Sequence, residues 1–322
     1  MSLEPKHPGL RLALRIGVVA LVVGCLGFAI AQEAGRVGDV DWRFQPGWLA
    51  LCLAALVLFE FLHIELWRLI LRVLGGHIEP PRARAIWSTT LLARYVPTSA
   101  LMAVGRVALS EREGVPKRVT LASVVYELAF TVVSALALCV YLLWRLPALD
   151  DHEWVRWLAT ASVVLGVAVL HPAIFHRVAD YVFKRMGRPP LPLSIPFGRV
   201  IELTVMYVVS FVVAGVAVLA MAQALHGLDV SDTYTAVASY GLGYVAGVVA
   251  FVIPGSLGAR EFGVALGLSV ALPWTVAVAV AIAVRLLQMG VEVLYAAVTP
   301  VLARRPMTSR RPRRLSGNFN RR

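Results

Sequence analysis

The chain has 322 residues, of which 59% are hydrophobic and only 16% are charged, and its mean hydropathy is +0.75. An ordinary globular protein contains about 25% charged and about 45–50% apolar residues. This composition excludes an ordinary soluble enzyme and indicates an integral membrane protein, with 31 Lys and Arg against 19 Asp and Glu and a net charge of +12.

Six apolar segments are long enough, or nearly so, to cross a hydrocarbon core about 30 Å thick. In chain order they are 12–31, 47–71, 119–143, 155–172, 200–222 and 275–298. Lys6, Arg11 and Arg15 lie before or at the start of the first segment, which could pass for a signal peptide. However, it is longer than a typical signal-peptide core, and no convincing small-residue cleavage site follows it, so a retained first span is predicted.

Two further apolar stretches, 85–110 and 235–272, are each interrupted by a proline. The first contains Pro97, and the second contains the sequence PGSLGARE at 254–261. Proline removes a backbone donor and glycine loosens a helix, so each stretch predicts two half-helices around a bend. The sequence therefore predicts an all-α integral membrane protein with six full spans plus two broken re-entrant hairpins, about eight membrane segments in all.

The two predicted hairpins occupy matching places, each between one span and the next. The first lies between 47–71 and 119–143, and the second lies between 200–222 and 275–298. In this topology they enter from opposite sides, which makes a weak inverted repeat of the kind found in many secondary transporters. Eight full spans with kinks are the alternative.

The distribution of Lys and Arg predicts the orientation of the chain, because positive charge stays preferentially on the cytoplasmic side. Loops at one side carry 25 of these residues, and loops at the other side carry four. The basic set is 1–15, 68–94, 106–118, 173–199 and 303–322, and the other set is 32–46, 145–156 and 223–233. Both termini are therefore predicted to be cytoplasmic.

The tail 303–322 holds eight arginines and no acid, so setting it aside lowers the net charge from +12 to +4. We expect one polytopic transmembrane domain over 1–302 and a disordered basic cytoplasmic tail over 303–322. An arginine cluster next to a membrane span favours an anionic membrane surface as its partner. No aromatic–basic interleaving or known module supports nucleic-acid binding.

Several charged residues are predicted to lie within the membrane, where a charge costs about 2.5–3.5 kcal/mol and is a candidate functional site. Glu127 lies well inside its span, and the polar residues Arg285, Gln288 and Glu292 form one stripe on the last span. Arg260 and Glu261 follow the glycine break at the start of a half-helix, where free backbone N–H groups favour an anion. Arg106 follows Gly105 in the first hairpin, in a comparable place.

A purely structural interpretation stays open, in which these charges form buried ion pairs that only hold helices together. The pairs considered are Glu127 with Arg285 and Glu261 with Arg106. Buried pairs alone rarely stabilise a protein more than apolar packing does. The charges also coincide with broken backbone, where a polar cavity is already required.

Charges nearer the cytoplasmic end of the second span have simpler interpretations. Glu65, Arg68 and Arg72 share one helix face and are interpreted as structural, since arginine side chains reach the membrane surface easily. Glu60 and His63 lie one turn deeper, and a contact between helices is favoured over a ligand site. Five glycines in the second half of the chain predict close helix packing, namely Gly241, Gly243, Gly247, Gly263 and Gly267.

No cofactor or metal is expected. The three cysteines lie in apolar runs without a nearby His or Cys cluster, and the histidines are scattered. No Ser/His/Asp set and no nucleotide-binding loop occurs, so an intramembrane enzyme is disfavoured.

The residues of the second hairpin resemble a known family. The string VIPGSLGAREFG at 252–263, followed in the last span by Arg285, resembles the signature of the lysylphosphatidylglycerol synthase transmembrane-region family, whose members are also called flippase-like domain proteins. The stretch from Tyr95 through Gly105 and Arg106 to Glu127 looks like the first motif of that family.

The resemblance implies an inner-membrane protein that moves anionic lipids or lipid-linked carriers between leaflets, or assists their movement. By this resemblance the motif positions are Pro97, Gly105 and Arg106 in the first motif and Pro254, Gly255, Gly258, Arg260, Glu261 and Arg285 in the second. Ser256 and Thr98 stand where the family commonly has glycine. No soluble aminoacyltransferase domain follows the last span, so lysyl-lipid synthesis is not expected.

The leading hypothesis is a lipid translocase whose arginines hold the headgroup of an anionic membrane lipid. The alternative is a membrane partner that transports nothing itself and assists an enzyme of lipid or polyprenyl-phosphate glycan synthesis. The lipid, the direction of movement and the oligomeric state stay open.

Overall fold

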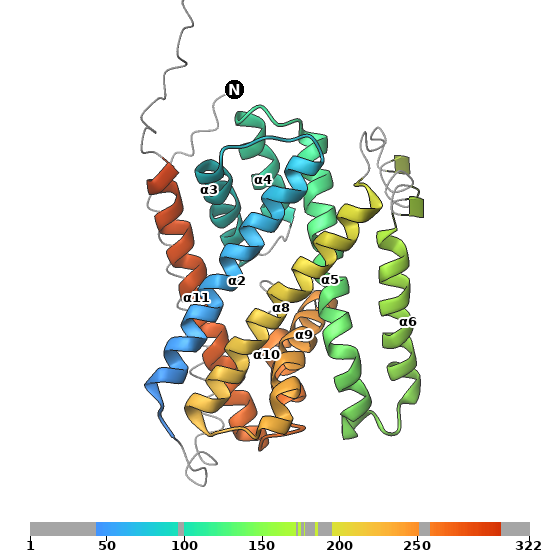
Figure 1. The fold of residues 1–322 in the computed structure, drawn as a ribbon, viewed down its shortest axis with the longest axis vertical. Coiled ribbons are helices and arrows are strands. Elements are labelled where there is room, and N and C mark those ends of the chain that lie inside the picture. Colours follow the sequence, from blue (N-terminus) through green and yellow to red (C-terminus); the bar gives the residue numbers. More distant parts are fainter. Residues whose placement is uncertain are drawn as a thin grey trace, which may run out of the picture.

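The computed structural model describes residues 43–95, 100–171, 173–174, 177, 184–185, 195–250 and 258–303. Within these ranges the regular structure is entirely helical (Figure 1). The α-helices are α2 Pro46–Val73, α3 Pro80–Leu91, α4 Ala100–Arg112, α5 Lys117–Arg145, α6 Glu153–Leu170, α8 Phe197–Leu225, α9 Thr233–Val249, α10 Ala259–Leu268 and α11 Trp274–Ala303. Short 3-10 turns cover Leu92–Tyr95, Pro147–Leu149 and Val230–Asp232.

Among the described residues, four helices are long and apolar enough to cross a membrane: α2, α5, α8 and α11. They have 28 to 30 residues and lie where the sequence predicts spans 47–71, 119–143, 200–222 and 275–298. The chain is therefore a multi-pass helical membrane protein. Helix α6, with 18 residues, forms where span 155–172 is predicted, but it is not among these four. The predicted span 12–31 and most of the basic tail lie outside the described residues.

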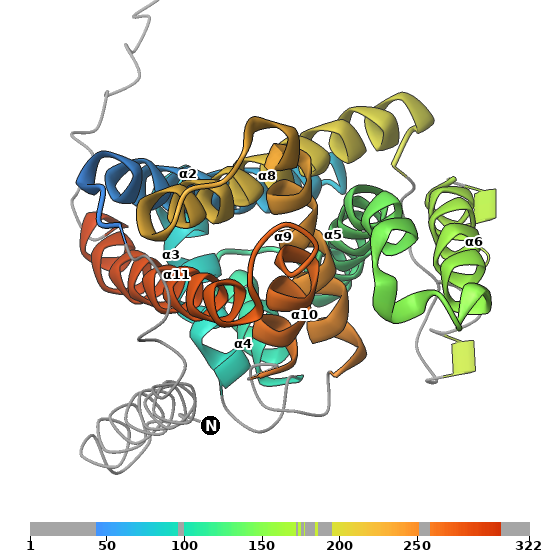
Figure 2. The ribbon, with the colours of Figure 1, turned by 90° about the horizontal axis from the view of Figure 1, so that it is seen from below.

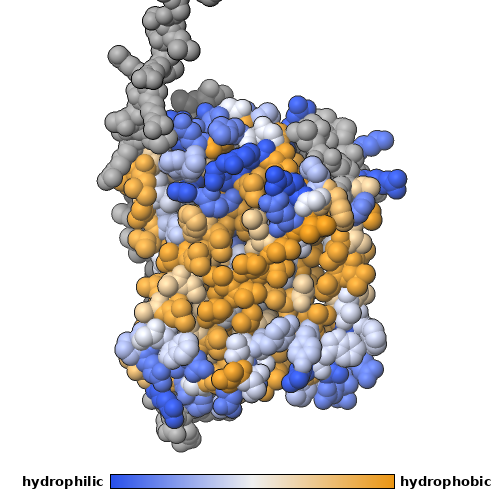
Figure 3. Space-filling view, in the orientation of Figure 1, coloured by the Kyte–Doolittle hydropathy of each residue, from blue (hydrophilic) through white to orange (hydrophobic). Residues whose placement is uncertain are grey.

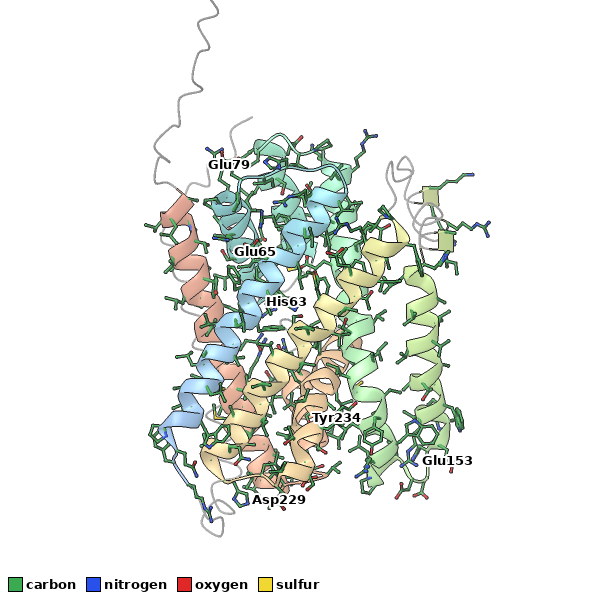
Figure 4. All side chains as sticks on the ribbon, viewed as in Figure 1. His63, Glu65, Glu79, Glu153, Asp229 and Tyr234 are labelled. Carbon is green, nitrogen blue, oxygen red and sulfur yellow. The ribbon has the colours of Figure 1, made fainter. Side chains whose placement is uncertain are left out.

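Apolar and polar residues are separated on the surface, as expected for a membrane protein. Figure 3 shows an apolar belt between two hydrophilic ends. Figure 4 places Glu79 at one end and both Glu153 and Asp229 at the other. The predicted cytoplasmic loop that contains Glu79 thus lies at the opposite end from the predicted outer loops that contain Glu153 and Asp229. The side of the membrane that each end faces remains a prediction.

Each of the two broken stretches contains a pair of helices, as predicted. The first pair is α3 and α4, with the turn Leu92–Tyr95 extending α3, and the second pair is α9 and α10. Figure 1 shows the first pair in the upper half of the molecule and the second pair in the lower half. The breaks at 96–99 and 251–257 lie outside the described residues, and re-entrant hairpins beside six full spans remain a prediction.

The long helices surround these two pairs. Helix α8 packs along α2, and α5 packs against both α8 and α9, while α6 stands at the edge against α5 (Figure 2). An aromatic group fills the centre, with Phe59 of α2 in edge contact with Phe211 of α8 and Tyr240 of α9. This packing brings α2, α9 and α11 close enough for their polar side chains to meet.

Glycine allows α9 and α10 to approach closely. A Cβ atom on Gly243 would lie 2.7 Å from the backbone oxygen of Arg260, and one on Gly263 would lie 2.8 Å from the Cα of Gly243. Neither position has room for a side chain. The predicted packing role is confirmed for Gly241, Gly243, Gly263 and Gly267, each of which lies against another helix.

We expect Gly243→Ala to lower the free energy of unfolding by about 1–3 kcal/mol, because the added methyl group overpacks the contact with α10. Gly290→Ala is the matched control, since nothing lies within 4 Å of a Cβ atom there. Thermal unfolding in detergent measures both. Equal melting temperatures for the two variants would contradict this account of the α9–α10 contact.

Candidate functional site

Helix α11 carries a buried polar stripe in its middle. Arg285, Gln288 and Glu292 are 4%, 2% and 0% exposed. At 1.5 Å per residue, Arg285 lies about 16 Å from the start of α11 and Glu292 about 16 Å from its end. Both charges therefore lie at membrane depth, as the sequence predicts.

Glu292 of α11 contacts the first helix pair at the turn Leu92–Tyr95, which follows α3. The hydroxyl of Tyr95 donates a hydrogen bond of 2.7 Å to Oε2 of Glu292, and Nη2 of Arg94 donates to Oε1. Nη1 of Arg285 lies 4.0 Å from the same Oε1. One carboxylate thus contacts two guanidinium groups and a hydroxyl, which joins the turn after α3 to α11.

Glu261 has the corresponding role at the second helix pair. Its Oε1 lies 3.1 Å from Nε of Arg285, and its Oε2 accepts a 2.8 Å hydrogen bond from the backbone N–H of Gly258. Gly258 has a φ of 84°, a left-handed conformation that favours glycine. The carboxylate of Glu261 therefore occupies the N-terminus of α10, where the free N–H groups and the helix dipole favour a negative charge.

Arg260 begins a hydrogen-bonded chain across four helices. Its guanidinium carbon lies 4.9 Å from the ring centre of Tyr240 and 5.7 Å from that of Tyr244, and Nη2 donates to the Tyr240 hydroxyl. That hydroxyl lies 3.4 Å from Oε1 of Gln288, to which it donates. Nε2 of Gln288 donates a 3.3 Å hydrogen bond to Oε1 of Glu60. Helices α10, α9, α11 and α2 are joined in this way.

We call these charged residues and the polar residues between them the central network. Its charged members are Arg94, Arg260, Arg285, Glu60, Glu261 and Glu292. Three arginines face three carboxylates, so with every group ionised the network has no net charge. His63, one turn along α2 from Glu60, lies near mid-height in Figure 4, which places the network between the two polar ends.

A second buried pair lies between the first helix pair and α5. Arg106 of α4 is 1% exposed and forms an ion pair with Glu127 of α5. Its guanidinium carbon lies 5.0 Å and 5.5 Å from the ring centres of Trp67 and Trp87. Nε1 of Trp87 donates a 2.9 Å hydrogen bond to Oε1 of Glu127. Indole rings and a carboxylate therefore replace water around this guanidinium.

The ion pairs considered from the sequence are wrong in their partners. Arg106 pairs with Glu127 rather than with Glu261, and Arg285 pairs with Glu261 rather than with Glu127. The reason is the packing of neighbouring elements, because α4 lies against α5 and α10 lies against α11. Arg106 also lies in the middle of α4, so the helix-terminal position expected for it holds for Arg260 alone.

The structure brings most predicted site residues together. Gly258, Arg260, Glu261, Arg285, Gln288 and Glu292 meet in the central network, while Arg106 and Glu127 form the separate pair described above. Positions Pro97, Thr98, Pro254, Gly255 and Ser256 lie outside the described residues.

Sequence reasoning missed part of the network. Arg94 and Tyr95 are a charged and an aromatic residue just before Pro97, and this position was the signal that could have identified them. Tyr240 and Tyr244 are one helical turn apart on a glycine-rich helix. The sequence predicts a contact between helices for Glu60, but its partner Gln288 lies 228 residues away in the sequence, and only the fold brings them together.

These groups fit anion binding better than metal binding. Within the described ranges, no group of three or more His, Cys, Asp or Glu side chains could hold a metal ion. Guanidinium groups and a helix N-terminus are the donors that bind phosphate and carboxylate. Here carboxylates of the chain itself occupy them.

A family comparison agrees with three features of the sequence. These are the proline and glycine at 254–255, the arginine–glutamate pair at 260–261 and Arg285 on the last long helix. The family model described as "Lysylphosphatidylglycerol synthase TM region" matches residues 12–295. The chain belongs to this family. No curated protein and no solved structure matches it. The match to the lysylphosphatidylglycerol synthase transmembrane-region family includes both helix pairs, the central network and the Arg106–Glu127 pair.

We predict that Arg106→Gln destabilises the protein by about 3–5 kcal/mol, because it leaves the carboxylate of Glu127 buried without its guanidinium partner. Arg106→Gln combined with Glu127→Gln should recover much of this loss. Thermal unfolding of both single variants and the double variant gives the coupling energy. Strictly additive effects would contradict a direct ion pair.

Proposed function

We propose that this protein moves an anionic phospholipid or an anionic lipid-linked carrier between the leaflets of the inner membrane. The observation that carries the proposal is the position of Glu261, whose carboxylate bridges the N-terminus of α10 and Arg285. It occupies the place that a phosphate or carboxylate headgroup would take. Family membership and the apolar belt of Figure 3 are compatible with a lipid substrate.

Charge balance constrains how the headgroup enters. With every group ionised the central network has no net charge, so an added anion would leave an excess negative charge in a medium that solvates charge poorly. We infer that the headgroup replaces Glu261 at Arg285 and that the released carboxylate turns toward water or takes up a proton. The acyl chains stay in the surrounding lipid, so only the headgroup crosses the polar interior.

The topology belongs to the same proposal. We propose six full spans with two re-entrant hairpins, both termini cytoplasmic, and the arginine-rich end in the cytoplasm. The opposite positions of the two helix pairs in Figure 1 support the hairpins. The separation of Glu79 from Glu153 and Asp229 in Figure 4 supports the division of the loops. The described ends of the two helix pairs, Arg94 and Tyr95 in the first and Gly258 to Glu261 in the second, would then reach the central network from opposite sides of the membrane.

We expect Arg285→Gln and Arg260→Gln to reduce leaflet exchange of anionic lipid at least about tenfold, since loss of one charge-assisted partner costs about 1.5–3 kcal/mol. The assay follows fluorescent phosphatidylglycerol in proteoliposomes and measures the fraction that reaches the opposite leaflet. The double variant Arg285→Gln with Glu261→Gln removes both charges of one pair. It should fold and remain inactive, which separates lost binding from lost folding.

Arg118→Gln is the matched control, because Arg118 is exposed at the start of α5 and away from the central network. It should exchange lipid at the rate of the unchanged protein. Exchange no faster than in empty vesicles, or full activity in both arginine variants, would refute the translocase. Co-purification of an enzyme of lipid or glycan synthesis, with cellular function surviving the same variants, would favour the alternative of a non-transporting partner.

A further inference from the structure

A groove between α2 and α8 lies apart from the central network, toward the arginine-rich end. Its cavity volume is about 430 Å³, within the range of small-molecule binding sites. Its lining is mostly apolar, and its three side chains from α8 are well exposed, with Val205 at 56%, Met206 at 41% and Val209 at 51%. Figure 3 shows this face, apolar across the middle and hydrophilic toward the upper end.

Charged side chains line the same groove on α2. Nη2 and Nε of Arg68 donate to Oε2 of Glu65, and Arg84 of α3 lies 2.7 Å from Oε1 of the same carboxylate. Both oxygens of Glu65 are thereby engaged. Arg72, one turn nearer the end of α2, is exposed and forms no ion pair with any described carboxylate. The groove thus combines apolar side chains with an arginine that no described carboxylate neutralises.

We propose that this α2–α8 groove binds one anionic phospholipid of the leaflet at the arginine-rich end. An acyl chain lies between Leu62, Leu69 and Val209, and the phosphate contacts Arg72 with Arg68 beside it. The charge is complementary, because anionic lipid attracts basic residues at the membrane surface, and basic pockets between membrane helices bind lipid headgroups. The long arginine side chains place the guanidinium groups near the headgroup level.

This site is independent of translocation. It opens on the lipid-facing side of α2, whereas the central network lies inside the bundle, and none of the groove residues belongs to that network. The sequence interpretation of Glu65, Arg68 and Arg72 as structural therefore holds for the Glu65–Arg68 contact and leaves Arg72 available for a ligand. Failure of the groove to bind lipid would leave the transport proposal unchanged.

The test is photolabelling of the full chain in phosphatidylcholine nanodiscs. Trace phosphatidylglycerol with a diazirine in one acyl chain is compared with the matching phosphatidylcholine probe, and labelled residues are mapped by mass spectrometry. We expect the anionic probe to label Val205, Met206 and Val209 more strongly than the neutral probe. Arg72→Gln should lower this labelling about fivefold, to the level of the neutral probe.

Two controls make the test selective. Arg118→Gln removes an exposed arginine at the same end and should leave labelling unchanged. Val209→Trp fills the groove and should abolish labelling, whereas Val167→Trp on the exposed face of α6 should not. Two results would show non-selective lipid contact only and overturn the proposal. One is equal labelling by both probes, and the other is labelling that neither Arg72→Gln nor Val209→Trp changes.

Discussion

The structure depends on one constraint, which is that guanidinium groups within an apolar layer must be surrounded by partners from the chain itself. Arg94, Arg260, Arg285 and Arg106 all lie at membrane depth or deep in the helix bundle. An unpaired charge there is costly, so carboxylates, hydroxyls and aromatic rings replace water around each one. At these positions, ion pairs and hydrogen bonds determine how the helices pack, in addition to the apolar contacts.

The two helix pairs meet this constraint in related ways. The first presents Arg94 and Tyr95 to Glu292, and the second presents Glu261 to Arg285, so a single helix, α11, holds both. Broken backbone and buried charge therefore occur together for a physical reason. Charged and polar side chains lie at the ends of the short helices next to the breaks, and Arg285 and Glu292 of α11 contact them.

The elements that could be predicted from sequence are those determined by local composition. Apolar runs gave the positions of α2, α5, α8 and α11, and proline and glycine gave the two breaks. The polar stripe on α11 followed from helical spacing. The partners of those charges could not be predicted, because Arg94 and Glu292 are 198 residues apart and their contact depends on how α3 packs against α11. The ion-pair partners of Arg106 and Arg285 were predicted wrongly for the same reason. Spacing along one helix does not show which other helix packs against it.

The most direct test of the account uses Glu292→Gln, which removes one negative charge from the central network and leaves Arg94 and Arg285 without this carboxylate. Thermal unfolding is measured in nanodiscs of phosphatidylcholine with and without phosphatidylglycerol. The account predicts that the variant melts below the unchanged protein in neutral lipid and regains stability selectively with the anionic lipid, because a bound anion stabilises the folded state. Glu202→Gln, at an exposed pair with Arg199, should show no such selectivity. An equal response of Glu292→Gln and the unchanged protein to both lipids would contradict the claim that headgroup and carboxylate compete for the same arginines.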